Sequence, residues 1–196
     1  YVGIGNMGGP MAANLARAGN EVVIGDLNQL AVDAFTTEHE TARPANGLAA
    51  VGQEAEAVFT CLPNGKIVAE AVLGEGGIAE GMAEGSVLVD MSSSAPMGTI
   101  DLGKTLSERG IRMVDAPVSG GVPRAVEGTI AIMVGGAKED IEKVRPALET
   151  MGGQIFETGG LGSAHAMKSI NNVLSATNLL VGIEALVVGK KFGLDP

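Results

Sequence analysis

Gly3-Ile4-Gly5-Asn6-Met7-Gly8, near the start of the 196-residue chain, decides the fold. The G-x-G-x-x-G spacing permits a tight turn and lets a pyrophosphate approach the N-terminus of a following helix. Because 30 residues of the chain are glycine, the pattern carries weight only with a helix behind it. That helix is predicted over 10–18, with Pro10 in its first turn and Gly19 after its end. The stretch therefore predicts a dinucleotide-binding turn, with Gly3, Gly5, Asn6, Met7 and Gly8 as cofactor-binding residues.

An acidic residue, Asp26, follows Gly8 at the end of the second predicted strand. A carboxylate in that place can accept hydrogen bonds from both ribose hydroxyls of a dinucleotide, and the alternative is an ordinary loop or cap aspartate. Leu27, Asn28 and Gln29 offer no arginine for a 2′-phosphate, which the carboxylate would also repel. We therefore expect NAD in preference to NADP.

Short apolar runs alternate with helical stretches in the order of an α/β, Rossmann-type doubly wound sheet. The predicted strands are 21–24, 57–61, 86–90, 111–115, 129–134 and 154–157. Among the helices between them, one starts near Pro96, with Ser93 or Ser94 as its cap, and another covers 138–150. The segment Leu62-Pro63-Asn64 follows a predicted strand and is expected beside the cofactor, although an ordinary turn explains Asn64 equally well.

The pattern changes after residue 162. Residues 164–192 read as one helix of about 29 residues, roughly 43 Å long, and apolar on most sides, as in a helix buried on several faces. We therefore predict a dinucleotide-binding domain over 1–162. Residues 163–196 are predicted to form an interdomain helix that begins an all-α second domain.

Composition excludes several classes of function. Thirteen Lys and Arg against 23 Asp and Glu give a net charge of −10, which argues against nucleic acid or an anionic membrane surface as partner. The single cysteine, Cys61, lies in an apolar run and is interpreted as a buried thiol. Asn178 and Glu184 interrupt the longest apolar stretch, 173–188, so no membrane span is predicted. No metal site is predicted, and the expected location is cytoplasmic.

Both ends of the chain suggest that further protein surrounds it. Only Tyr1 and Val2 precede the glycine motif, whereas a buried strand normally needs about five residues. The apolar helix before Gly193 has no evident partner in the chain. We expect a leading segment, which leaves room for an organellar targeting peptide, and further protein downstream.

Polar groups for a substrate occur in two places. Ser119, Gly120 and Gly121 follow a predicted strand and can present a hydroxyl and successive N–H groups to a carboxylate, although an empty glycine turn is the alternative. Lys168 and Asn172 lie one turn apart on the long helix and share a face, where a surface lysine and an interhelical hydrogen bond are the alternatives. His165 is interpreted as structural.

The chain resembles the 3-hydroxyisobutyrate dehydrogenase-like β-hydroxyacid dehydrogenases over essentially its whole length. The matching blocks are 3–12, 62–64, 90–96, 115–121 and 168–172. The resemblance implies that Lys168 is the catalytic acid/base and that Ser119, Gly120 and Gly121 hold the substrate carboxylate. It also implies that Asn172 orients the substrate and that Ser93 replaces a threonine near the cofactor, while Leu62 and Pro63 belong to the cofactor site.

The implied reaction passes a hydride between a short β-hydroxyacid and the nicotinamide while Lys168 takes the hydroxyl proton. A lysine with its ordinary pKa of about 10.4 would be a poor base, so burial is expected to lower that pKa. The resemblance also implies a homo-oligomer, either a dimer or a tetramer. The alternatives are a tartronate semialdehyde (2-hydroxy-3-oxopropionate) reductase, a 6-phosphogluconate dehydrogenase-like or imine reductase-like enzyme, and a non-catalytic dinucleotide-binding module. Lys168 and Asn172 argue against the last of these.

Overall fold

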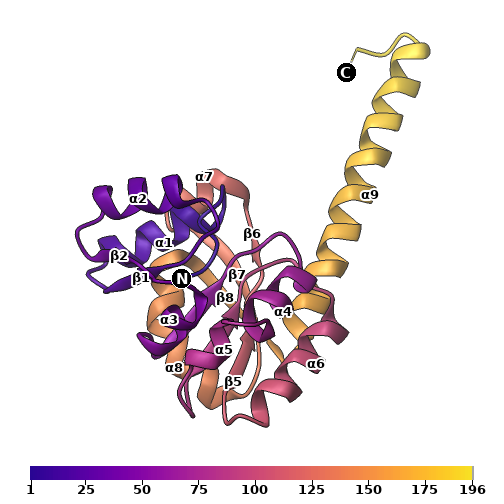
Figure 1. Cartoon of the computed structure of the whole chain (residues 1–196). Coiled ribbons are helices and arrows are strands. Elements are labelled where there is room, and N and C mark those ends of the chain that lie inside the picture. The colour runs from indigo at the N-terminus through magenta and orange to yellow at the C-terminus, as the bar shows by residue number, and fades with distance from the viewer. Residues whose placement is uncertain (196) are drawn as a thin grey trace.

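The glycine motif lies between an isolated bridge at Val2 and the first helix. The computed structural model describes residues 1–195 (Figure 1). Val2 bridges in parallel to both Gly25 and Thr60, so it joins a two-stranded sheet to a six-stranded one. Within the described residues, the eight strands are β1 (Val22–Ile24), β2 (Ala42–Pro44), β3 (Ala57–Thr60), β4 (Val87–Asp90), β5 (Arg112–Asp115), β6 (Val118–Ser119), β7 (Ile130–Gly135) and β8 (Gly152–Gly159).

Strand order confirms the doubly wound sheet. The small sheet pairs β1 with β2, and the larger one runs β3-β4-β5-β7-β6, with β8 beside β7. Strands β3, β4 and β5 are parallel, whereas β7 is antiparallel to β5 and β6. From Val2 the chain first builds the sheet in one direction, through β1 and β2, and then in the opposite direction, through β3, β4 and β5. Dinucleotides bind at the point where the strand order reverses in this way.

Helices cover both faces of the sheet. They are α1 (Gly8–Arg17), α2 (Gln29–Glu38), α3 (Leu48–Gln53), α4 (Gly65–Leu73), α5 (Ile78–Gly81), α6 (Pro96–Ser107), α7 (Gly121–Val126), α8 (Lys138–Met151) and α9 (Ser163–Lys191). In β4, Val87 and Val89 belong to the apolar cluster with α1 and α8, whereas Leu88 belongs to the cluster with α4 and α6. Successive side chains of a strand point to opposite faces, so one strand contributes to both cores.

The predicted elements are present with shifted ends, and one predicted cap is wrong. The six predicted strands correspond to β1, β3, β4, β5, β7 and β8, while β2 and β6 were not predicted. Neither Ser93 nor Ser94 caps α6, because its N-cap is Ala95 without a side-chain hydrogen bond. The Ser94 hydroxyl instead donates to the buried carboxylate of Asp90.

Helix α9 is the 29-residue helix expected after residue 162, and it projects from the body of the molecule (Figure 1). Only Ala164 and His165, in its first turn, are buried. Its large apolar side chains, from Ile170 to Val188, are exposed. By length and composition the helix could cross a membrane, contrary to the expectation that no segment would meet that criterion.

Candidate active site

A pocket of about 1310 Å³ follows the carboxyl edge of the sheet from the glycine turn to α9. It exceeds the roughly 300–1,000 Å³ of ordinary small-molecule sites, which suits a dinucleotide with a small substrate. Thirteen of the predicted site residues line it: Gly3, Gly5, Asn6, Met7, Gly8, Asp26, Leu62, Pro63, Ser93, Ser119, Gly120, Gly121 and Lys168.

The three glycines of the motif are needed for different structural reasons. A Cβ on Gly3 would lie 2.4 Å from the Cys61 carbonyl oxygen, and a Cβ on Gly8 would lie 1.9 Å from the Gly3 carbonyl oxygen. A Cβ on Gly5 would meet no atom within 4 Å, although this residue lines the pocket. The turn itself therefore requires glycine at 3 and 8, whereas Gly5 leaves space into which a pyrophosphate fits.

Asp26 lies at the pocket, where its carboxylate also organises the backbone. Its Oδ2 accepts the N–H of Ile4 at 2.8 Å, and its Oδ1 accepts the N–H of Asn28 at 2.9 Å. The other carboxylates that line the pocket are Glu70 and Glu75. Among the lining residues within 1–195, Lys168 is the single cation, so this end of the pocket offers a 2′-phosphate no positive charge.

The segments that follow β3 and β4 contain both residues that line the pocket and residues with a structural role. Leu62, Pro63, Ser92 and Ser93 line the pocket. Asn64 instead caps α4, because its Oδ1 accepts the N–H groups of Lys66 and Ile67, both at 3.1 Å. The turn interpretation of Asn64 is therefore the one the structure supports. Ser92 was missed because nothing in the sequence separates it from the neighbouring serines.

Cys61 has the properties of an inert thiol. Burial, with a smaller effect from the Asp90 carboxylate, raises the pKa of the Cys61 thiol to about 11. At pH 8 the thiolate fraction is then about 10⁻³, against about 0.2 for a free cysteine of pKa about 8.5. We expect iodoacetamide to modify Cys61 about 10²-fold more slowly than glutathione at pH 8, as measured by peptide mass spectrometry. Equal rates would contradict this prediction.

The predicted substrate groups and the lysine line the same pocket. Ser119 ends β6, Gly120 is the N-cap of α7 and Gly121 is its first residue, and the two glycines have φ angles of 143° and 77°. Lys168 is half-buried on α9, and this burial lowers the pKa of its ammonium group. Asn172 is exposed and is absent from the pocket lining. Its substrate contact stays a prediction.

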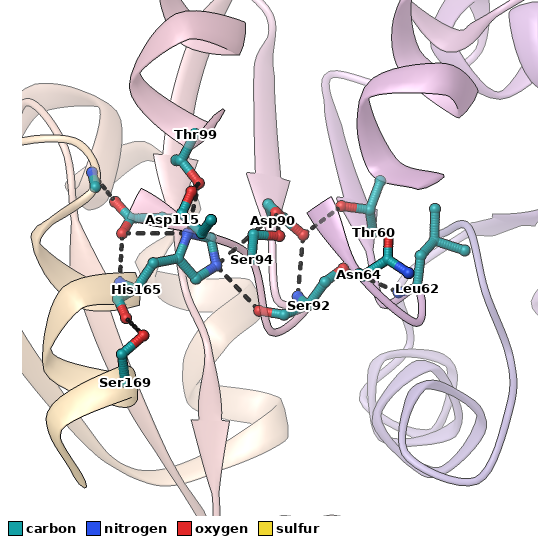
Figure 2. Close-up of polar contacts among 12 residues, drawn as sticks. Thr60, Leu62, Asn64, Asp90, Ser92, Ser94, Thr99, Asp115, His165 and Ser169 are labelled. Carbon is teal, nitrogen blue, oxygen red and sulfur yellow. Dashed lines mark hydrogen bonds and ion pairs between the residues drawn. The ribbon is translucent and has the colours of Figure 1, made fainter. Parts of the chain in front are cut away.

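Three positions before Lys168 on α9, His165 belongs to a buried polar cluster that the sequence did not reveal. Figure 2 shows the His165 imidazole between the carboxylates of Asp90 and Asp115, which end β4 and β5. Burial raises the pKa of Asp115, against the opposing effect of N–H groups donated by His165 and Gly162. His165 is fully buried, in agreement with its structural interpretation.

Two family models together account for nearly the whole chain. Residues 1–160 match the NAD binding domain of 6-phosphogluconate dehydrogenase. Residues 162–196 match the NAD-binding domain of NADP-dependent 3-hydroxyisobutyrate dehydrogenase. The chain belongs to the 3-hydroxyisobutyrate dehydrogenase family of β-hydroxyacid dehydrogenases. The second model covers the whole of α9, so the long helix belongs to the part of the chain that matches this family.

Individual relatives agree with the family. The chain is 40% identical to 2-(hydroxymethyl)glutarate dehydrogenase of Eubacterium barkeri and 39% identical to 3-hydroxyisobutyrate dehydrogenase of Pseudomonas aeruginosa, over 100% of its own length. It spans 64% and 65% of those two proteins. The structure of Mycobacterium tuberculosis 3-hydroxyisobutyrate dehydrogenase with L-serine superposes with a TM-score of 0.92 at 31% identity, covering 99% of this chain and 65% of that one.

Proposed function

We propose that the full-length protein is an NAD-dependent dehydrogenase of a short β-hydroxyacid, with Lys168 as acid/base. One observation carries the proposal: the glycine turn, the Ser119–Gly121 segment and Lys168 line a single pocket. The family's dinucleotide would lie along the glycine turn and Asp26, and it supplies the hydride acceptor when bound.

The residues at the α9 end would handle the substrate. The hydroxyl of Ser119 and the N–H groups of Gly120 and Gly121 would hold the carboxylate. The Lys168 amine would then take the proton of the substrate hydroxyl as the hydride leaves its carbon, and would return the proton in the reverse direction. A carboxylate anchored at Ser119–Gly121 and a base at Lys168 favour β-hydroxyacids. In these acids the carbinol carbon is bonded directly to the carbon that carries the carboxylate.

The first experiment assays the full-length protein with NAD and with NADP across a panel of short acids. The panel contains 3-hydroxyisobutyrate, 2-(hydroxymethyl)glutarate, glycerate and 4-hydroxybutyrate for oxidation, and tartronate semialdehyde for reduction. We expect turnover of at least one compound, with a higher kcat/KM for NAD. Tight binding of NAD with no turnover of any compound would favour a non-catalytic dinucleotide-binding module instead.

Cofactor choice can be tested at Leu27, a fully exposed residue that lines the pocket directly after Asp26. Leu27→Arg would place a guanidinium within reach of the position that a 2′-phosphate would occupy. A hydrogen bond to a charged group contributes about 1.5–3 kcal/mol, so we expect kcat/KM for NADP to rise about tenfold or more. The value for NAD should stay within threefold. A wild type that already prefers NADP would overturn the proposed NAD preference.

The rate should depend on pH in opposite ways for the two directions. Oxidation needs the neutral amine of Lys168, so kcat is expected to rise with pH, with a midpoint below the ordinary lysine pKa of about 10.4, because burial lowers the pKa of Lys168. Reduction needs the protonated amine, so kcat should fall over the same interval. Stopped-flow profiles from pH 6 to 10 test this, and flat profiles in both directions would rule out Lys168 as the ionising group.

A second proposal concerns the domain boundary. Residues 1–162 would form the dinucleotide-binding domain, and α9 would begin a helical domain of the same chain that covers its exposed apolar residues. The greater length of the relatives and the exposure of α9 support this arrangement.

Subunits would then associate as a dimer or tetramer, which analytical ultracentrifugation of the full-length protein measures directly. A monomeric mass for the full-length protein would overturn the proposed dimer or tetramer.

A further inference from the structure

The start of α9 is attached to the sheet through the buried histidine. Asp90 and Asp115 are partners in register at the ends of the parallel strands β4 and β5. The imidazole of His165 lies between them, with Nε2 3.8 Å from Asp90 Oδ2 and Nδ1 3.6 Å from Asp115 Oδ2 (Figure 2). All three side chains are at most 1% exposed. Such complete burial of polar groups is stable only when their hydrogen bonds are satisfied.

The ring of His165 makes two hydrogen bonds to different elements. Its Nε2 lies 3.0 Å from the carbonyl oxygen of Ser92, in the loop after β4, and its Nδ1 lies 2.8 Å from Oγ1 of Thr99 on α6. A carbonyl oxygen can only accept, so Nε2 carries a proton and donates it. The imidazole therefore connects α9 to the β4 loop and to α6.

Asp115 holds the backbone of the same helix turn. Its Oδ1 accepts the N–H of Gly162 and its Oδ2 accepts the N–H of His165, both at 2.8 Å. The N-cap of α9 is Gly162, which has no side chain to cap the helix. A carboxylate from β5 therefore replaces the missing cap and also interacts favourably with the helix dipole.

The same hydrogen bonds reach the cofactor side of the pocket. Ser92, which accepts from His165 through its carbonyl oxygen, also accepts the N–H of Leu62 through its Oγ at 2.9 Å (Figure 2). Leu62 and Ser92 line the pocket together with Lys168. Lys168 follows His165 by three positions, so the two residues are neighbours on α9. One continuous set of contacts thus joins the cofactor loops to the turn that carries the lysine.

We propose that His165 is a positioning residue: through Ser92, Thr99 and the Asp115-bound first turn of α9, it sets the place of the Lys168 amine relative to the cofactor loops. The inference rests on the proposed role of Lys168 as acid/base. Reacting groups must lie within about 3–3.5 Å, and a misplacement of about 1 Å can cost about 10² in rate. His165 contributes to the rate in this way without contacting the substrate.

The test uses the full-length protein with His165→Leu, which removes both ring hydrogen bonds, and His165→Gln, whose amide can still donate to Ser92. The control is His39→Gln, at a histidine that packs against Phe35 of α2. We expect His165→Leu to lower kcat about 10²-fold while the Kd for NAD stays within threefold. His165→Gln should recover at least tenfold of that loss, and His39→Gln should match the wild type.

Three outcomes would overturn the inference. They are a kcat within threefold of wild type in His165→Leu, equal losses of kcat and NAD affinity, or no recovery in His165→Gln. If His165→Leu does not fold, Thr99→Val serves instead, because it removes the Nδ1 partner and leaves the imidazole in place. The variant also removes the hydrogen bond from Thr99 Oγ1 to the carbonyl oxygen of Ala95. It should lower kcat about tenfold with NAD affinity retained, and an unchanged kcat would then overturn the inference.

Hydrogen exchange separates this inference from the proposed function. If the wild type turns over no acid of the panel, the proposed function fails, but exchange of the amides of residues 163–168 still reports on the attachment of α9. These amides should exchange at least tenfold faster in His165→Leu, and unchanged exchange would overturn the attachment. If Lys168→Ala is inactive but His165→Leu is as active as wild type, only the positioning role fails.

Discussion

Replacing Lys168 with alanine in the full-length protein is expected to lower kcat for hydroxyacid oxidation by about 10²–10⁴-fold, the usual contribution of a general acid/base. Lys168 is the single cation among the pocket-lining residues within 1–195, and it shares the pocket with the Ser119–Gly121 segment. The glycine turn and Asp26 stay intact in this variant, so the Kd for NAD from calorimetry should stay within threefold.

Two further variants show which property of the lysine matters. Lys168→Arg keeps the positive charge, but a guanidinium stays protonated and is unable to act as a base. We expect it to lose kcat nearly as fully as the alanine variant. Lys104→Ala, at an exposed lysine of α6 paired with Asp101, should match the wild type. Full activity in Lys168→Arg would show that the charge, and not proton transfer, is what the site requires.

Replacing Gly8 with alanine is expected to damage both cofactor binding and folding. The new Cβ would lie 1.9 Å from the Gly3 carbonyl oxygen and 3.1 Å from Cβ of Cys61. Gly3 is unable to retreat, because it already lies against the carbonyl group of Cys61. Overpacking of this kind costs about 1–3 kcal/mol or more. We expect a lower Tm by calorimetry and a Kd for NAD at least about 100-fold weaker, equivalent to about 2.8 kcal/mol.

Two other glycines serve as matched controls for that prediction. Gly5→Ala meets no protein atom within 4 Å, so it should fold with an unchanged Tm and lose NAD affinity because the methyl group occupies the pyrophosphate space. Gly98→Ala, inside α6 and equally free of contacts, should bind NAD normally and gain about 0.4–1 kcal/mol of stability. An unaltered NAD affinity in Gly8→Ala would contradict the assigned turn geometry.

Periodicity and helix-end residues were sufficient to predict the long or buried elements. Strands β3, β4 and β5 are apolar runs buried by helices on both faces, and α9 is a helical pattern of 29 residues. The shorter elements carry no such signal. Two of the three residues of β2 are exposed, and β6 has only two residues. Their pairing depends on neighbouring strands and not on their own composition.

In the candidate site, too, local patterns were predictable and contacts between distant residues were not. Contiguous motifs, such as the glycine turn and Ser119–Gly121, predicted residues that do line the pocket. The errors and omissions concern side chains whose partners are distant in sequence. Ser94 fails to cap α6 because the buried Asp90 takes its hydroxyl. Asn172 is not among these errors: in residues 1–195 it lies outside the pocket lining, and its substrate contact stays a prediction.

By itself, the sequence determined the sheet, the long helix and the family, because these depend on local spacing: glycines that permit a turn, apolar runs that must be buried, and a lysine on an apolar helix. Only the tertiary structure decided what surrounds His165. Strand pairing places Asp90 and Asp115 in register, although they are 25 positions apart in the sequence, and α9 places His165 between them. Such a site arises from burial and pairing of distant segments, for which no local pattern in the chain exists.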